Sequence, residues 1–108
     1  MTLPSERIAD HLAGRPIMVV GRAGMDIYPM PDGTRVEDAY ELVNDVGGSS
    51  GNIAVSIAKQ GHPVMLLSAV SNDGVGRFVM RSLGEYGVDT RHCFATTGLE
   101  RTSLAMAE

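Results

Sequence analysis

The central stretch of this chain reads Gly47-Gly48-Ser49-Ser50-Gly51-Asn52-Ile53-Ala54-Val55-Ser56-Ile57-Ala58-Lys59-Gln60-Gly61, a glycine- and serine-rich segment that runs directly into an apolar one. The glycines and serines disfavour a regular element, whereas the apolar residues that follow repeat at helical spacing. Gly61 fits the position after the last helical turn, and Pro63 cannot continue the helix. The stretch therefore predicts a glycine-rich turn that leads into a buried helix.

This turn has the features of a ligand-binding loop. Glycine permits positive φ and the close approach of another group, so Gly47 and Gly48 suit a tight loop beside a ligand. The first turn of the helix directs unpaired N–H groups toward that loop, and Asn52 on this turn offers two donors and an acceptor. A simpler interpretation also fits, in which the glycines make only a sharp connection and Asn52 only caps the helix.

Two short apolar runs lie on either side of this stretch. Residues 17–20 and 64–70 are bounded by Pro or Gly or Ser, the pattern of strands that are buried on both faces of a parallel sheet. With the central helix between them, they predict a β-α-β unit whose crossover should be right-handed. The sequence therefore predicts an α/β fold.

Further elements are predicted before and after this unit. Ser5 can cap an amphipathic helix, which is expected to be a packing extension. Asn72 or Asp73 can cap a second amphipathic helix that ends at Gly87. The remaining apolar runs are predicted to be short strands, at residues 90–94 and 103–107.

The segment after the first strand does not favour a dinucleotide-binding fold. Gly21-x-x-Gly24 lacks the third glycine and the apolar helix that this fold requires. Two prolines and the turn-forming pair Asp32-Gly33 instead predict short strands that leave the sheet. Residues 36–46 fit either a strand or a short helical turn. Asp26 is expected at the carboxyl end of the first strand, where open α/β sheets bind ligands.

Several motifs of the chain resemble those of one enzyme family. The run Gly47-Gly48-x-x-x-Asn52-x-Ala54, followed by Gly61 and by Asn72-Asp73-x-x-Gly76, resembles the amino-terminal signature of the PfkB, or ribokinase-like, carbohydrate kinases. Residues 21–29 are similar to one branch of that family, the 5-dehydro-2-deoxygluconokinases of inositol breakdown. The resemblance departs at Ser50, where the family prefers Pro, Ala or Gly, and at Ser71, where it usually has Gly.

The resemblance covers about residues 16–108 and implies a ribokinase-like three-layer α/β/α fold with a mostly parallel sheet and a small β-lid. Residues 1–108 would then be the amino-terminal part of one kinase domain, with about 27–46 and 100–108 contributing to the lid. Lid strands often pair between subunits in this family, so a homodimer through the lid is expected. The catalytic Asp, in a Gly-Ala-Gly-Asp turn, and the nucleotide pocket would lie beyond Glu108, so no catalytic residue is expected within this chain.

The resemblance also implies an activity, namely transfer of the ATP γ-phosphoryl group, with Mg²⁺, to a primary hydroxyl of a sugar or sugar acid. Asp26 would accept hydrogen bonds from sugar hydroxyls, and Asn52 would both donate and accept. Gly47 and Gly48 would let the backbone approach the sugar. Two other functions stay open, a ribokinase-like kinase for another sugar or a nucleoside and an α/β binding module without catalytic activity.

Two arginines are further candidates for substrate contacts. Arg22 and Arg101 could face a carboxylate or keto group, because the guanidinium fork suits planar pairs of oxygen atoms. Both positions fit surface charges equally well.

Composition limits the other classes of function. A chain of 108 residues suffices for one small domain, and 44% apolar with 20% charged residues is typical of globular proteins. The net charge of -4, without a cluster of Lys or Arg, argues against nucleic acid or an anionic membrane as partner. Cys93 cannot form an internal disulfide and has no metal-ligand spacing with the histidines. No run reaches the length of a membrane helix, and a cytoplasmic location is expected.

Overall fold

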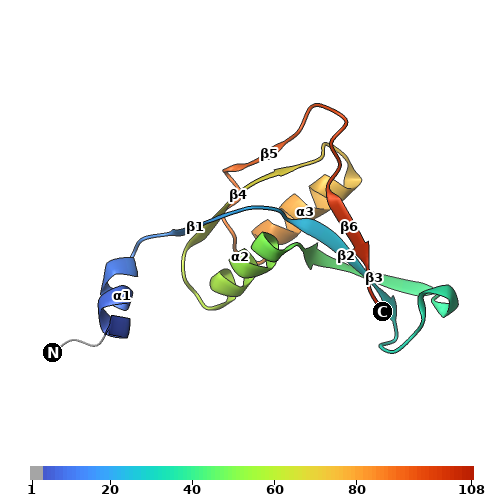
Figure 1. Cartoon of the computed structure of the whole chain (residues 1–108), viewed down its shortest axis with the longest axis horizontal. Helices are drawn as coiled ribbons and strands as arrows, with labels where there is room; N and C mark the ends of the chain where they lie inside the picture. The colour runs from blue at the N-terminus through green and yellow to red at the C-terminus, as the bar shows by residue number, and fades with distance from the viewer. Residues whose placement is uncertain (1–3) are drawn as a thin grey trace.

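Two separate three-stranded sheets organise the computed structural model, which describes residues 4–108 (Figure 1). The helices and strands, in chain order, are α1 (Pro4–Leu12), β1 (Ile17–Val20), β2 (Gly24–Met30), the 3-10 helix η1 (Val36–Asp38), β3 (Glu41–Gly47), α2 (Ser49–Lys59), β4 (Val64–Val70), α3 (Gly74–Glu85), β5 (Cys93–Ala95) and β6 (Ser103–Met106). The first sheet has the order β1-β4-β5 and the second the order β3-β2-β6.

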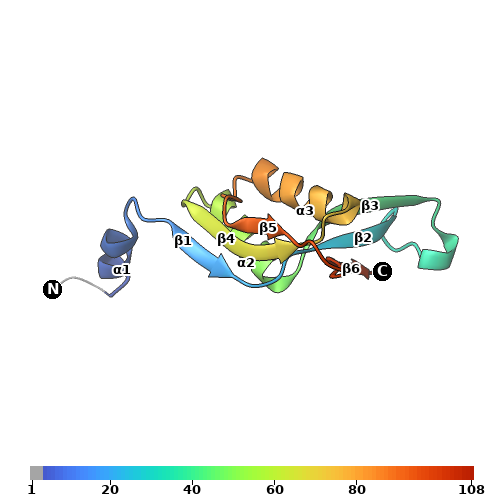
Figure 2. The ribbon, with the colours of Figure 1, turned by 90° about the horizontal axis from the view of Figure 1, so that it is seen from above.

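The first sheet is parallel throughout and confirms the predicted β-α-β unit. Strand β1 pairs with β4 from Ile17 opposite Val64 to Val20 opposite Leu67, and α2 lies between these strands in the sequence. Strand β5 pairs with the other edge of β4. Alternate residues of β4 are buried against the helices, with Leu66 fully enclosed, and Figure 2 shows α3 lying along this sheet. One helix-covered face therefore holds the apolar core.

The opposite face of the first sheet is uncovered within residues 4–108, so the prediction of strands buried on both faces is wrong for this chain. Met18 and Val20 of β1 are 50% and 64% exposed, and Leu67 and Phe94 are also exposed. The physical reason is that successive right-handed crossovers in one direction put both helices on the same side of a sheet.

The second sheet combines a hairpin with a parallel strand. Strands β2 and β3 pair antiparallel, while β6 joins the other edge of β2 in parallel. The predicted turn at Asp32-Gly33 lies in the hairpin connection, where Gly33 has a φ of 88° and the Thr34 amide donates to the Pro31 carbonyl at 3.1 Å. The segment 36–46, left open by the sequence, contains both a short helical turn, η1, and most of a strand, β3.

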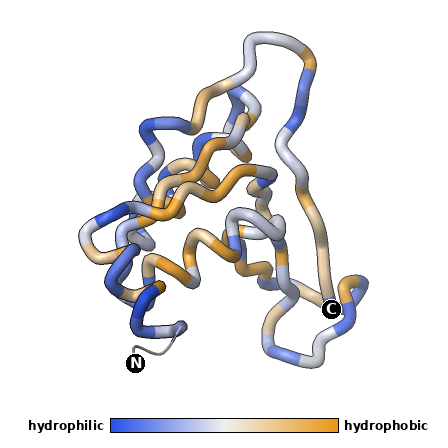
Figure 3. Tube along the Cα trace, turned by 60° about the vertical axis from the view of Figure 1, so that its left-hand side comes forward, coloured by the Kyte–Doolittle hydropathy of each residue, from blue (hydrophilic) through white to orange (hydrophobic). Residues whose placement is uncertain are grey.

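Helix α1 confirms the predicted amino-terminal helix but not its expected packing. None of its residues is buried, and Ile8 on its apolar stripe is 59% exposed. Figures 1 and 2 show it apart from both sheets, and Figure 3 shows it as mainly hydrophilic. An apolar stripe is buried only where a second apolar surface meets it, and residues 4–108 provide none here. No helix of the described segment has the length and apolar character to cross a membrane.

The loop between α3 and β5 provides a pH-dependent contribution to stability. Asp89 pairs with the Arg91 guanidinium, 2.7 Å from Asp89 Oδ2 to Arg91 Nη2, and it also accepts the Arg91 backbone N–H. These side-chain and backbone bonds lower the pKa of Asp89 to about 2. Because the folded-state pKa is depressed, this contribution exists above the unfolded-state pKa, about 3.9, and is lost as pH falls through about 2.

We therefore expect Asp89→Asn to lower the thermal midpoint at pH values above about 5. The protein tested is the complete product of the gene that encodes this chain, called the complete gene product below. The difference from the parent should shrink as pH falls from about 4 to about 2, since the parent loses the ion pair there. Thermal unfolding at a series of pH values measures this. Asp10→Asn, on the unburied helix α1, is the control, and a difference that does not depend on pH would contradict the assignment.

Candidate functional site

The junction between β3 and α2 is the centre of the candidate site. Strand β3 ends at Gly47, Gly48 is the N-cap residue, and α2 begins at Ser49. The predicted turn is therefore shorter than expected, because Ser50 and Gly51 are already helical. Gly51 packs closely against Ala23 and Val46, and a Cβ atom at this position would crowd both side chains.

Asn52 lies on the first turn of α2, as predicted, and its side chain is exposed. The backbone N–H of Asn52 donates to the Gly48 carbonyl at 2.9 Å. Because Gly48 occupies the N-cap position, the simpler interpretation of Asn52 as the helix cap is wrong. The role of Asn52 in ligand binding stays a prediction.

Asp26 does not lie at the end of the first strand, contrary to the expectation. Strand β1 ends at Val20, and Asp26 is the third residue of β2 in the second sheet. The chain leaves the first sheet at Gly21-Arg22-Ala23 and starts a new strand at once, so the strand end and Asp26 belong to different sheets. Asp26 pairs across the sheet with Asp45.

Gly47 provides the space that the Asp26 carboxylate occupies. A Cβ atom on Gly47 would overlap the carboxylate group of Asp26. Tyr28, two residues along β2 and on the same face, donates its hydroxyl to Asp26 Oδ2 at 3.2 Å. The structure therefore brings Asp26 and Gly47 into direct contact, and Gly48 follows in the chain.

Gly48 has a backbone conformation that favours glycine. Its φ of 81° with ψ of 144° is rare for residues with a side chain, and a Cβ would lie 2.8 Å from the Arg22 carbonyl oxygen. The Gly51 amide donates to the same carbonyl at 3.2 Å. Arg22 thus reaches the junction through its backbone, and its side chain is exposed.

Sequence reasoning missed two residues of this face, Tyr28 and Asp45. Asp45 faces the same way as Asp26 and accepts the Tyr86 hydroxyl at 2.9 Å. Burial, and then the charge of Asp26, raises the pKa of Tyr28, while the hydrogen bond to Asp45 raises that of Tyr86. Both phenols therefore stay protonated donors at neutral pH. The two-residue spacing from Asp26 could have identified Tyr28, whereas Asp45 lay in the segment that the sequence left unassigned.

A cavity of about 320 Å³ opens beside the junction. It lies between the end of β3, one side of α2 and the end of α3, and its lining residues are Asp45, Val46, Asn52, Val55, Ser56, Lys59 and Tyr86. Lys59 Nζ lies 4.8 Å from the centre of the Tyr86 ring. Asn52 faces this cavity, whereas Asp26 adjoins it only through its cross-strand partner Asp45.

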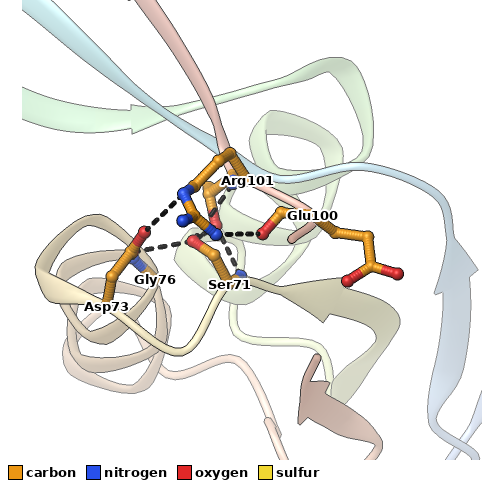
Figure 4. A network of polar contacts seen from close by, with 6 residues as sticks. Ser71, Asp73, Gly76, Glu100 and Arg101 are labelled. Carbon is orange, nitrogen blue, oxygen red and sulfur yellow. Dashed lines mark hydrogen bonds and ion pairs between the residues drawn. The ribbon is translucent and has the colours of Figure 1, made fainter. Parts of the chain in front are cut away.

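Arg101 lies elsewhere, at the amino-terminal end of α3 (Figure 4). Its Nε atom is 4.0 Å from Asp73 Oδ2, and its Nη1 atom donates to the Glu100 carbonyl at 3.1 Å. Asp73 is the N-cap of α3, as predicted, and accepts the Gly76 amide at 2.9 Å. That bond is the main cause that lowers the pKa of Asp73. The structure gives Arg101 no contact with the Gly47 junction.

Ser50, one departure from the family pattern, links α2 to β1. Its hydroxyl donates to the Val20 carbonyl at 3.3 Å. A Cβ on Gly21 would overlap the Ser50 hydroxyl, so a glycine at position 21 makes room for this serine. The departure therefore has a structural partner within the same junction.

These observations describe an α/β protein in which two carboxylates and a phenol of the second sheet, and a second phenol at the end of α3, lie beside a glycine turn and a helix amino terminus. A family model described as pfkB family carbohydrate kinase matches residues 15–108. The chain belongs to the pfkB family of carbohydrate kinases.

Curated relatives and solved structures agree with this assignment. The chain is 35% identical over 91 residues to 5-dehydro-2-deoxygluconokinase of Photobacterium profundum, and 33% identical over 92 residues to that of Clostridium tetani. These alignments cover 84% and 85% of the chain, but the chain spans only 28% and 27% of the two relatives.

Fructokinase structures share the fold of the chain. The Xylella fastidiosa enzyme with bound ATP has a TM-score of 0.71 at 27% identity, covering 85% of this chain and 29% of that one. The Vibrio cholerae enzyme, bound to fructose, ADP and calcium, has a TM-score of 0.73 at 26% identity, covering 86% and 28%. The predicted ribokinase-like fold is thereby confirmed for the amino-terminal part that the chain spans.

Proposed function

We propose that this chain is the substrate-binding portion of an ATP-dependent kinase that transfers a γ-phosphoryl group to a primary hydroxyl of a sugar or sugar acid. The preferred substrate is 5-dehydro-2-deoxygluconate, in inositol catabolism. The observation that carries the proposal is the carboxylate of Asp26, seated over Gly47 beside the amino terminus of α2, in a chain of the pfkB family. The names of the curated relatives support the choice of substrate.

In this proposal the second sheet is the lid over the sugar, and its residues orient the substrate. Asp26 accepts hydrogen bonds from sugar hydroxyls, and the Tyr28 hydroxyl holds one carboxylate oxygen so that the other faces the ligand. Asn52 donates and accepts on the other side of the glycine turn. Gly47 and Gly48 lack side chains, so the sugar can approach the backbone.

The residues of this site do not fit Mg²⁺-ATP. Asp26 and Asp45 face the same way beside the helix amino terminus, and two carboxylates would repel a triphosphate. Residues 4–108 contain no group of three His, Cys, Asp or Glu side chains that could hold a metal ion. We therefore propose that other residues of the complete gene product hold ATP and Mg²⁺ and supply the catalytic base.

The exposed residues of the second sheet also suit a subunit contact. Leu42, Leu104 and Met106 are exposed apolar side chains on one face of its strands, opposite the face of Asp26. A second copy that covers them would give a homodimer through the lid. Arg22 remains a candidate for the substrate carboxylate, because its backbone lies against Gly48, and a cytoplasmic location fits an enzyme that consumes ATP.

A panel of substrates tests the proposed function. The complete gene product is assayed with ATP and 5-dehydro-2-deoxygluconate, 2-keto-3-deoxygluconate, ribose, fructose or adenosine, with ADP release coupled to NADH oxidation. We expect kcat/KM for the deoxy keto acids to exceed that for the other substrates by at least about tenfold, the scale that a few polar contacts provide. A preference for ribose, fructose or adenosine would select the alternative kinase. Absence of phosphorylation of any substrate would favour a binding module.

A further inference from the structure

Ser71 and Thr102 form a reciprocal joint between the two sheets, at the end of β4 and just before β6. The Ser71 amide donates to Thr102 Oγ1 at 2.8 Å, and the Thr102 amide donates to Ser71 Oγ at 3.1 Å. The two hydroxyl oxygens are 2.6 Å apart. Two residues far apart in the sequence are thus joined by three hydrogen bonds, and Ser71 is only 3% exposed.

A neighbouring carboxylate fixes the direction of these bonds. Ser71 Oγ lies 2.7 Å from Asp73 Oδ1. An ionised carboxylate can only accept, so Ser71 donates its proton to Asp73, a bond between two residues labelled in Figure 4. Thr102 must therefore donate its own proton to Ser71 Oγ. Each hydroxyl then donates its one proton to a defined acceptor. The hydrogen bonds of the joint therefore fit a single arrangement.

The joint is continuous with the candidate site through the second sheet. Strand β6 begins directly after Thr102 and pairs with β2, with Ala105 opposite Asp26. On the other side, a Cβ on Gly76 would overlap the Ser71 carbonyl, so α3 packs directly against the joint. A displacement of Thr102 relative to Ser71 would move the strand next to Asp26.

We propose that Ser71 and Thr102 are positioning residues, which hold the second sheet against the first sheet and α3 so that Asp26 faces the sugar. The inference rests on the proposed function for its kinetic consequence but not for the joint itself. Ser71 stands where the family pattern usually has Gly, which could not form the bonds of the serine hydroxyl.

The test uses Ser71→Ala, Thr102→Val and the double variant of the complete gene product. Each single variant is expected to raise the sugar KM about 3- to 10-fold, the equivalent of about one net hydrogen bond, and to change the ATP KM by less than about twofold. The double variant should resemble the single ones, because both substitutions break the same joint. Thr102→Ser, which keeps the hydroxyl, should restore the parent KM. Ser103→Ala, an exposed neighbour, is the matched control.

Hydrogen exchange separates failure of this inference from failure of the proposed function. In both single variants the amides of β6 and of Ala107, which donates to the Ile27 carbonyl, should exchange at least about tenfold faster than in the parent and the control, whether or not any sugar is phosphorylated. Unchanged exchange in β6 would overturn the joint. Faster exchange with equal effects on sugar and ATP KM would overturn the positioning role.

Discussion

Asp26→Ala in the complete gene product is expected to lower kcat/KM for the sugar on the order of 10- to 100-fold, while the ATP KM stays nearly constant. The carboxylate is the charged acceptor nearest the glycine turn, and each lost hydrogen bond to a charged group costs roughly 1.5–3 kcal/mol. At about 1.4 kcal/mol per factor of ten, one such bond gives this range. Steady-state kinetics with the sugar and with ATP varied separately measures it.

Asn52→Ala is expected to show the same pattern with an equal or smaller loss, because its amide is uncharged. Asn44→Ala is the matched control. Asn44 is exposed on β3 and lies on the face of the sheet opposite Asp45 and the site, because successive residues of a strand point to opposite faces. If the melting temperature of the Asp26 and Asn52 variants falls while their sugar kcat/KM holds, both residues are scaffolding and the site assignment fails.

Gly48→Ala should destabilise the junction strongly, by about 2 to 6 kcal/mol of unfolding free energy. The first part of the cost is a backbone conformation that residues with a side chain rarely adopt, about 1–3 kcal/mol. The second part is the collision with the Arg22 carbonyl, 2.8 Å from the new Cβ, for which overpacking of about 1–3 kcal/mol is typical. Urea unfolding of the complete gene product, followed by circular dichroism, gives the value.

Three other glycines separate the parts of this effect. Gly33 has a φ of 88°, and no atom lies within 4 Å of where its Cβ would be. Gly33→Ala therefore measures the cost of the backbone conformation alone. Gly84→Ala lies in α3 with open space and should stabilise by up to about 1 kcal/mol through helix propensity. Gly47→Ala displaces the Asp26 carboxylate, so it should reproduce the kinetic loss of Asp26→Ala. A Gly48→Ala variant as stable as the parent would contradict the geometry of the turn.

Most of the first sheet and its helices could be predicted, because local signals and tertiary packing agree there. The end of α2 at Lys59, just before Gly61 and Pro63, and the cap of α3 at Asp73 depend on backbone chemistry within a few residues. The start of α2 could not be predicted from the same rules. Ser49 to Gly51 have low helix propensity, and they are helical because Gly51 allows close packing on Ala23.

The candidate site depends on long-range pairing, which a single sequence does not specify. The contact of Asp26 with Gly47 and the common face with Asp45 follow from the register of β2 and β3. Tyr86 reaches Asp45 only because α3 ends beside the second sheet. The family resemblance correctly indicated the fold, while the roles of Asp26, Asn52, Arg22 and Arg101 in binding remain predictions.

The parallel pairing of β6 with β2 has a consequence for the order in which the chain acquires its structure during synthesis. The hairpin of β2 and β3 can form from neighbouring residues, but Gly24 must wait for Ser103, which follows much later in the chain. Closing so long a loop is slow and is entropically costly until its contacts form. Until residues 103–106 leave the ribosome, one edge of β2 keeps its backbone N–H and C=O groups open to other chains, which makes this interval the one in which mispairing is most probable.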